Sequence, residues 1–192
     1  MVVEDGADAP KPDRSPPART PPDRGAPLLI TAELPPDVFA WADELRRAHY
    51  PPERNRLGAH VTLFHGLPPS AEAEVRRLLG EMAQRPAPEA CVCGLMDLGR
   101  GTAFALDSPA LVALHAEMAE RLHGVIQQKD LRPLRPHITV QNKVSADAAR
   151  ALQAGLAHEL PHRPFRFRGL GLSHWREELW RPAQVYPFRG RA

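Results

Sequence analysis

The sequence predicts an α+β protein with two similar lobes around a shared central groove. Apolar residues recur in some segments with the two-residue period of a strand and in others with the longer period of a helix. These segments follow one another in an order that nearly repeats, and each half contains one strand that begins with a histidine. No long stretch of sequence identity accompanies the repeat, so the duplication is inferred from the order of the elements.

The composition is typical of a globular protein of about one domain. Of the 192 residues, 43% are hydrophobic and 25% are charged, and the formal net charge is +2. So small a charge does not by itself indicate nucleic-acid binding, and any such chemistry requires a compact site. No apolar run approaches the roughly 18 residues of a membrane-spanning helix, and the first residues lack the pattern of a secretory signal. We therefore expect a cytoplasmic monomer that does not contact a membrane.

Residues 1–26 are predicted to form a disordered proline-rich tail, and residues 27–192 a single bilobal domain. Seven of the 22 prolines fall at positions 10 to 27, among Asp, Arg and Ala residues and almost no large apolar side chains. Such a segment cannot bury enough apolar surface to offset the conformational entropy that it would lose on ordering.

The first half begins with an apolar strand near residues 28–30. A helix over 35–49 follows, because its prolines suit a first turn and Pro51 prevents its continuation. Next comes a strand over 59–64, after which Ser70 can cap a second helix. The apolar side chains of this second helix recur at helical spacing: Val75, Leu78, Leu79 and Met82.

The second half has a similar order of elements. Gly99 and Gly101 are typical of a hairpin connection, Ser108 and Ser145 can each cap a helix, and Gly124 suits a helix end. The predicted elements are strands over 90–98 and 103–107, a helix over 108–124, a strand over 136–141, a helix over 145–158, and strands over 165–172 and 184–188.

Two histidine-containing strands carry the strongest functional signal. Two of the five threonines, Thr62 and Thr139, follow a histidine by two positions, in the segments His60–Leu63 (HVTL) and His137–Val140 (HITV). Because side chains alternate across a strand, each histidine shares one face with its threonine, and the aliphatic residues occupy the other face. We expect the two strands to face each other across one cleft and to place two imidazoles and two hydroxyls around a small ligand.

This set of groups suits the cleavage of a phosphodiester. One histidine can take a proton from an attacking 2′-hydroxyl or water while the other protonates the leaving oxygen. An ordinary histidine pKa of about 6.5 allows one neutral and one charged ring near neutral pH. The threonine hydroxyls can donate hydrogen bonds to the non-bridging phosphate oxygens. This chemistry requires no metal and no other cofactor.

Structural and metal-binding roles are the alternatives for these histidines. A lone His-x-Thr on a strand is usually structural, and it is the matched pair, 77 positions apart, that favours catalysis. A zinc site needs more ligands, whereas each strand face supplies one imidazole and no Glu or Cys stands where a third ligand is expected. Cys91 and Cys93 lack partners for a metal set, so we interpret them as buried, reduced thiols.

At the two motifs the chain resembles the 2H phosphoesterase superfamily. This superfamily includes the 2′-5′ RNA ligase-like proteins, RNA 2′,3′-cyclic phosphodiesterases and plant-type cyclic nucleotide phosphodiesterases. Its hallmark is two copies of His-hydrophobic-Thr/Ser-hydrophobic, and both copies are complete here. By element order the resemblance covers about residues 28–188. It implies a bilobal fold of two antiparallel-sheet lobes with flanking helices around a central cleft, and metal-independent hydrolysis.

The resemblance also implies roles for the motif residues. His60 and His137 would be the acid–base pair, and Thr62 and Thr139 would bind the phosphate. In bacterial RNA-repair members a basic residue commonly follows the second motif closely, whereas here two residues intervene before Lys143. The identity of the basic side chain that contacts the substrate is therefore left open.

Three further residues are weaker candidates for substrate binding. By alternation Phe64 shares the face of the first motif histidine and could stack on a base, with core packing as the alternative. Gln141 shares the face of the second motif histidine in the same way. Arg135 precedes the second motif and could contact a phosphate.

Other side chains near the motifs have structural alternatives. Alternation places His65 on the core side of its strand, which favours a turn or packing role. Trp175 and Trp180 could line one rim of the groove or cover the core of the second lobe.

The sequence therefore predicts a phosphoric diester hydrolase that opens a 2′,3′-cyclic phosphate or hydrolyses a 2′-5′ linkage. Its expected partner is an RNA- or nucleotide-derived phosphodiester substrate. One alternative is a protein that binds RNA ends or a nucleotide without turnover, although pure binding does not require two imidazoles. Another is a hydrolase of a non-RNA cyclic phosphate.

Overall fold

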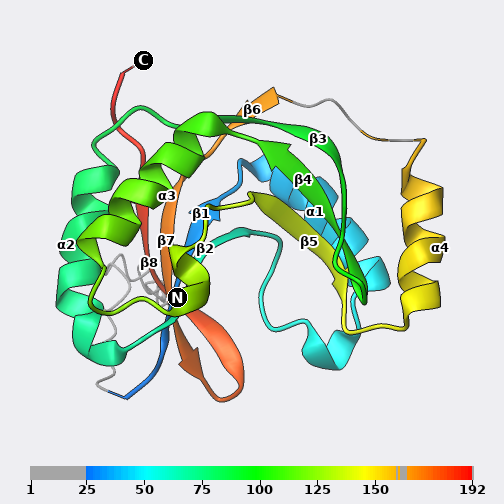
Figure 1. Ribbon diagram of the computed structural model, residues 1–192, viewed down its shortest axis with the longest axis horizontal. Helices are drawn as coiled ribbons and strands as arrows, with labels where there is room; N and C mark the ends of the chain where they lie inside the picture. Colours follow the sequence, from blue (N-terminus) through cyan, green and yellow to red (C-terminus); the bar gives the residue numbers. More distant parts are fainter. Residues whose placement is uncertain (1–24, 159, 161–163, 192) are drawn as a thin grey trace, which may run out of the picture.

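Two four-stranded antiparallel sheets form the body of the protein, and helices flank them (Figure 1). The computed structural model describes residues 25–158, 160 and 164–191. The predicted tail lies outside these residues except for Gly25 and Ala26, and Ala26 is buried. The predicted α+β class with two antiparallel-sheet lobes is confirmed. Within the described ranges, every helix is too short or too polar to span a bilayer.

The two strands that carry the motifs lie at the edges of their sheets. The first sheet has the order β2-β1-β7-β8 and the second the order β5-β4-β3-β6. Strands of the first sheet are β1 (Leu28–Glu33), β2 (Val61–Leu67), β7 (Gly169–Arg176) and β8 (Leu179–Pro187). Strands of the second sheet are β3 (Glu89–Asp97), β4 (Gly101–Asp107), β5 (His137–Asn142) and β6 (Pro164–Arg166). The edges β2 and β5 contact each other, so the two motifs meet where the sheets adjoin.

Four α-helices are found in the described residues. They are α1 (Pro36–His49), α2 (Glu72–Met82), α3 (Pro109–Arg121) and α4 (Ala146–Leu156). Short 3-10 helices span Pro52–Arg54, Pro69–Ala71 and Gln128–Leu131.

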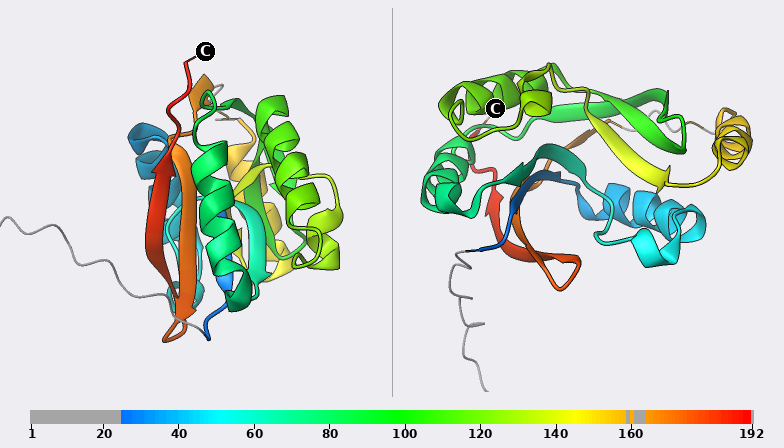
Figure 2. Two further views of the ribbon diagram at one scale, coloured as in Figure 1. Left: turned by 90° about the vertical axis from the view of Figure 1, so that its left-hand side faces the viewer. Right: turned by 60° about the horizontal axis from the view of Figure 1, so that its bottom comes forward.

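Buried apolar side chains from both sheets belong to one core, and the sheets lie as two layers (Figure 2). Leu28 and Ile30 of the first sheet share this core with Val92 and Phe104 of the second. Helix α1 follows β1 in the chain but lies against β5 of the second sheet, and its Trp41 ring is 4.6 Å from that of Phe104. The helix thus links the two halves beside the motif strands.

The four helices lie where the sequence predicts them, with small differences at their ends. Ser145 caps α4 as predicted, since its hydroxyl accepts the N–H of the residue three positions later at 3.1 Å. Ser108 is the N-cap residue of α3, but its hydroxyl donates to the carbonyl of Glu89 at 2.6 Å and not to its helix. The predicted capping role of Ser70 is wrong, because this residue lies in the 3-10 helix that precedes α2.

The predicted strand over 165–172 is wrong in one respect, because it is two strands in different sheets. Strand β6 ends at Arg166 and pairs with β3, whereas β7 begins at Gly169 and pairs with β1. The chain therefore crosses from one sheet to the other between these residues. Strand pairing of this kind depends on contacts far apart in the sequence, which local periodicity does not encode.

The last strand begins at Leu179 rather than at residue 184, because β7 and β8 form a hairpin. The hairpin turns at Glu177 and Glu178, whose φ angles are 49° and 60°. Glycine or asparagine usually occupies such a turn, so the sequence carries no signal for it. Pro182 is accommodated because β8 is an edge strand and the pairing register shifts beside this residue.

Candidate active site

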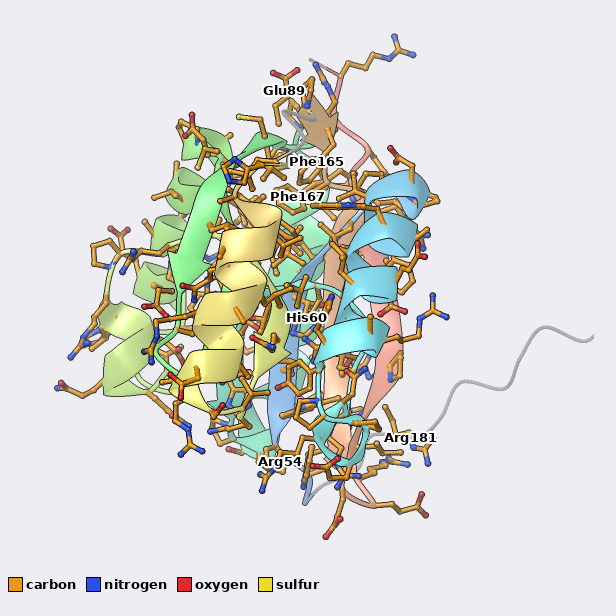
Figure 3. The ribbon with its side chains drawn as sticks, turned by 90° about the vertical axis from the view of Figure 1, so that its right-hand side faces the viewer. Arg54, His60, Glu89, Phe165, Phe167 and Arg181 are labelled. Atoms are coloured by element: carbon orange, nitrogen blue, oxygen red, sulfur yellow. The ribbon has the colours of Figure 1, made fainter. Side chains whose placement is uncertain are left out.

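A cavity of about 750 Å³ lies at the junction of the two motif strands. Thr62 of β2 and Thr139 of β5 line it, together with His60, which directly precedes β2. Figure 3 shows His60 near the middle of the molecule, between α1 and α4 in that view. His137, at the start of β5, is not among the described residues that line the cavity, but it interacts electrostatically with His60. The fold thus brings the two motifs to one place.

The two imidazoles are held in the same way. The Nδ1 atom of His60 lies 2.7 Å from the carbonyl oxygen of Gly58, and that of His137 lies 2.7 Å from the carbonyl oxygen of Arg135. Because a carbonyl only accepts, the proton of a neutral ring sits on Nδ1 and leaves Nε2 as an acceptor. The Nε2 atom of His60 lies 3.1 Å from the Thr62 hydroxyl, so these two groups converge on one point.

A β-bulge at the last residue of each motif changes which side chains face the cavity. The pairing of β2 with β1 skips Leu63, and the pairing of β5 with β4 skips Val140. One unpaired residue shifts the alternation of side chains by one position. As a result His65 and Asn142, each five positions after its motif histidine, line the cavity.

The predicted positions of Phe64 and Gln141 in the groove are therefore wrong. Phe64 is fully buried and stacks on His115 of α3, with the ring centroids 4.5 Å apart, so it packs in the core. Gln141 is also buried, and its side-chain oxygen accepts a hydrogen bond from the hydroxyl of Thr102 at 3.4 Å. The predicted core-side position of His65 is wrong for the same reason, since the bulge turns its side chain into the cavity.

Arg135 contributes to the site through its backbone. Its carbonyl fixes the ring of His137, while the residue is exposed and is not among the described residues that line the cavity. Contact between its guanidinium and a phosphate stays a prediction.

The electrostatic surroundings of His60 favour its neutral form. Its pKa is lowered from 6.5 to about 4, mainly because the ring is buried away from water. The hydrogen bond to Gly58 opposes this shift. Electrostatic interactions with Arg46, His137 and His65 add to it. At neutral pH, His60 is therefore uncharged and can accept a proton at Nε2.

Arg46 of α1 is a buried cation in the cavity wall that was not among the predicted site residues. Its Nε donates to the side-chain oxygen of Asn55 at 2.7 Å and to the carbonyl of Leu57 at 3.0 Å. Its Nη1 donates to the carbonyl of Thr139 at 2.8 Å, and its guanidinium lies 4.1 Å from the centroid of the Tyr50 ring. Arg46 thus connects the helix of the first half to the motif strand of the second half.

The sequence contains a signal for Arg46 but none for His65 or Asn142. Val38, Ala42 and Arg46 recur every four positions and form the buried face of α1, so a charged residue continues an apolar stripe. Such a position predicts a buried ion that needs partners. A β-bulge, in contrast, leaves no mark in a run of apolar residues.

Aromatic rings line part of the same cavity. Trp175 and Trp180 flank the β7–β8 turn with ring centroids 5.1 Å apart, and Trp180 makes an edge contact with His65 at 5.3 Å. Both tryptophans line the cavity, which agrees with the first of the two alternatives given for them, the rim of the groove. Aromatic faces of this kind are suited to stacking with unpaired bases.

The side chains that could ligate a metal ion are dispersed. Among the described residues, no three His, Cys, Asp or Glu side chains gather in a metal-binding arrangement. Cys91 is partly buried and Cys93 is exposed, and both are free thiols. The predicted burial of Cys93 is wrong, because the pairing of β3 with β4 skips this residue at a bulge.

Comparisons of sequence place both motifs within one family. A family model described as the 2′-5′ RNA ligase superfamily matches residues 34–178. No curated protein sequence matches the chain.

Comparisons of structure find the same fold in solved proteins. The crystal structure of TT0787 of Thermus thermophilus is 16% identical with a TM-score of 0.61, over 86% of this chain and 100% of that chain. Escherichia coli LigT, solved with NADP+, is 17% identical with a TM-score of 0.57, over 86% of this chain and 99% of that chain. A structure described as a phosphoesterase is 18% identical with a TM-score of 0.58, over 85% and 98% of the two chains. At these identities the similarity shows a shared fold.

Proposed function

The chain belongs to the 2′-5′ RNA ligase superfamily of 2H phosphoesterases, and from this premise we propose that it is a metal-independent phosphodiesterase. Its proposed substrate contains a 2′,3′-cyclic phosphate or a 2′-5′ linkage in RNA or a nucleotide. LigT, which shares the fold, has been solved with NADP+, with 3′-AMP and with ATP, and these ligands support a nucleotide-derived substrate.

The observation that carries this proposal is the matched arrangement of the two motifs. Each imidazole donates from Nδ1 to the carbonyl two residues earlier at 2.7 Å, which orients Nε2 for proton transfer. A protein that only binds a nucleotide has no need to fix two rings in this way. Two oriented rings are what a reaction with one proton acceptor and one proton donor requires.

The surroundings of His60 support a role for it as the base. His60 is neutral at neutral pH, so it acts as the base that takes a proton from the attacking water. The water oxygen forms a bond to phosphorus, and the bond from phosphorus to one ribose oxygen breaks. His137 then gives its proton to that ribose oxygen, and the two histidines exchange protonation states over the reaction.

The threonine hydroxyls stabilise the negative charge of the phosphate during the reaction. Thr62 and Thr139 line the cavity from opposite sheets and donate to the two non-bridging oxygens. The Nη1 atom of Arg46 donates a hydrogen bond to the carbonyl oxygen of Thr139 at 2.8 Å. This bond helps to position the second motif strand beside the first motif. We assign Arg46 a positioning role.

Turnover of a 2′,3′-cyclic nucleotide in the presence of a chelator tests the proposal. His60→Ala and His137→Ala should each lower kcat/KM about 10²–10⁴-fold. His158→Ala, a change at an exposed histidine after α4, is the matched control and should leave activity unchanged.

Two outcomes would contradict the proposal. Binding without turnover by the wild-type protein would indicate a nucleotide-binding protein. Unchanged turnover in either motif variant would remove that histidine from the mechanism.

A further inference from the structure

A second cavity adjoins the one that contains His60. It has a volume of about 400 Å³ and is lined by Tyr50, Glu53, Arg54, Arg56 and Lys143. All of these except Lys143 come from the segment that joins α1 to the first motif, and Lys143 directly follows β5. Tyr50, Arg54 and Arg56 also line the first cavity, so the two cavities are adjacent. Figure 3 shows Arg54 on the same face of the molecule as His60, toward the end where α1 stops.

The second cavity is cationic. Three basic side chains line it and Glu53 is the one acidic residue among its described lining residues. No acidic side chain in the described part of the chain forms an ion pair with Arg54 or Lys143, and Arg56 has only an exposed contact with Glu178 at 3.5 Å. A group of three cations with so few acidic neighbours, at the edge of a site for a phosphodiester, is suited to an anion.

Some exposed arginines on other parts of the surface are paired with carboxylates. Arg77 contacts Glu81 at 2.7 Å, and Arg121 contacts the same carboxylate at 2.6 Å. Arg54 and Lys143 differ from these two arginines, because no described carboxylate pairs with them.

The backbone at Lys143 adds an independent observation. Lys143 has a φ angle of 62°, in the left-handed region that favours glycine. The equivalent position of the first half, six residues after its motif histidine, is Gly66 with a φ angle of 77°. The second half thus has a lysine in a conformation for which the first half has a glycine. The Asn142 side chain accepts the N–H of Lys143 at 2.8 Å and helps to fix this turn.

We propose that the second cavity binds another phosphate group of the same substrate, next to the phosphate that reacts. The inference rests on the proposed function and extends it. When the reacting group is a terminal 2′,3′-cyclic phosphate, the neighbouring phosphate is the one on the 5′ side. Arginine binds it through paired N–H groups and lysine through its charge. The substrate is then an RNA end or a nucleotide with a 5′-phosphate, rather than a nucleoside cyclic phosphate alone.

Three substrates test the inference and separate the two sources of the phosphate. They are adenosine 2′,3′-cyclic phosphate, the same compound with a 5′-phosphate, and a dinucleotide that ends in a 2′,3′-cyclic phosphate. We expect the 5′-phosphate to raise kcat/KM about tenfold, since it adds charge-assisted hydrogen bonds. An equal or greater gain for the dinucleotide assigns the cavity to RNA ends, and a gain confined to the 5′-phosphate assigns it to small nucleotides.

Variants of residues that line the second cavity test whether this cavity causes the gain in kcat/KM from the 5′-phosphate. Lys143→Gly removes the charge and suits the left-handed backbone, and Arg54→Gln removes the second unpaired cation. In the double variant the ratio of kcat/KM with and without the 5′-phosphate should fall close to one. Arg77→Gln, on the exposed face of α2, should keep the wild-type ratio. A ratio that is the same in the wild-type protein and the double variant would overturn the inference.

Equilibrium binding distinguishes failure of this inference from failure of the proposed function. The probes are adenosine 2′-monophosphate and adenosine 2′,5′-bisphosphate, titrated calorimetrically into the wild-type protein and the double variant. Tighter binding of the bisphosphate that is lost in the double variant supports the second site, even without turnover. Equal affinities in the wild-type protein overturn the second site, whether or not the protein is a phosphodiesterase.

Discussion

The strands that carry His60 and His137 share their local geometry but differ in their surroundings. Each ring donates to the carbonyl two residues earlier at 2.7 Å, and a bulge lies at the last residue of each motif. At His60 this contact is partly buried, whereas at His137 it is exposed. The comparison teaches that a repeated motif supplies two equal side chains, while the fold around His60 favours its neutral form.

The helix that joins the two halves contributes to the surroundings of His60. Helix α1 belongs to the first half of the chain but lies against β5, and it carries the buried Arg46 into the cavity wall. Burial lowers the pKa of His60, and the charge of Arg46 contributes further. The proposed role of His60 as the base therefore rests on its burial and, in part, on the charge that this helix carries.

The largest predicted effect separates the roles of the two histidines. His60→Ala and His137→Ala should be about equally damaging on a 2′,3′-cyclic nucleotide, since each removes a positioned acid or base. On a phosphodiester with a 4-nitrophenyl leaving group, which departs without a proton, His137→Ala should lose less than about tenfold in kcat/KM. His60→Ala should keep its full defect on both substrates, as measured by steady-state kinetics.

The pH profile provides a second measurement of the same difference. The wild-type kcat/KM should fall as the pH drops through about 4, because His60 then gains a proton and no longer accepts one. This acid limb should be missing from the residual activity of His60→Ala. Rescue of His60→Ala by the nitrophenyl substrate, or persistence of the limb in that variant, would show that the roles are assigned the wrong way round.

The next largest effect is expected for Arg46→Met. This substitution removes the guanidinium that links α1 to β5 but retains most of the side-chain packing. The change leaves the oxygens of Asn55, Leu57 and Thr139 without their donor, and it should cost about 3 kcal/mol of unfolding free energy in urea titrations. Loss of a nearby positive charge makes protonation of His60 easier, so its pKa rises. The acid limb of kcat/KM should accordingly move to higher pH.

Arg47→Met is the matched control for this prediction. Arg47 is the next residue of α1, its side chain is 68% exposed, and it contacts Asp43 at 3.3 Å. Its loss should cost less than about 1 kcal/mol and leave the acid limb in place. Equal effects of the two substitutions would mean that Arg46 has no special role in linking the halves.

The fold class and the positions of the motifs were predictable because they depend on the local spacing of apolar residues along strands and helices. Strand alternation correctly places Thr62 and Thr139 on the cavity side of their strands. The same rule fails two residues later, at Phe64 and Gln141, because Leu63 and Val140 are left unpaired. A bulge is fixed by how a strand meets its neighbour, and neither residue type signals it.

The pairing of strands was also beyond the reach of local patterns. The segment near Arg166 crosses between sheets, and the hairpin at Glu177 and Glu178 uses residues that are uncommon in such a turn. Arg46, in contrast, could have been identified from its place on the apolar stripe of α1. The missed features therefore divide into those with a sequence signal and those set only by tertiary contacts.

The smallest predicted effects compare Gly66 with Lys143, which occupy equivalent turns after the two motifs. Gly66→Ala should cost about 1–2 kcal/mol of unfolding free energy, because a side chain at a φ angle of 77° is strained. A Cβ atom there would also lie 2.9 Å from the side-chain nitrogen of Gln127, whose flexible end can move away. Urea unfolding measures the cost, and a neutral result would show that this turn relaxes easily.

Lys143→Gly should have the opposite effect on the free energy of unfolding and slightly stabilise the protein. Glycine accepts the φ angle of 62° without strain but loses more chain entropy on folding, so the net gain in stability should be at most about 1 kcal/mol. A variant that is at least as stable as the wild-type protein, yet loses the preference for a second phosphate, would mean that the lysine is present for its charge and not for the turn. A clearly destabilised variant would instead mean that the lysine side chain supports the fold, and the two turns would differ in structure rather than in function.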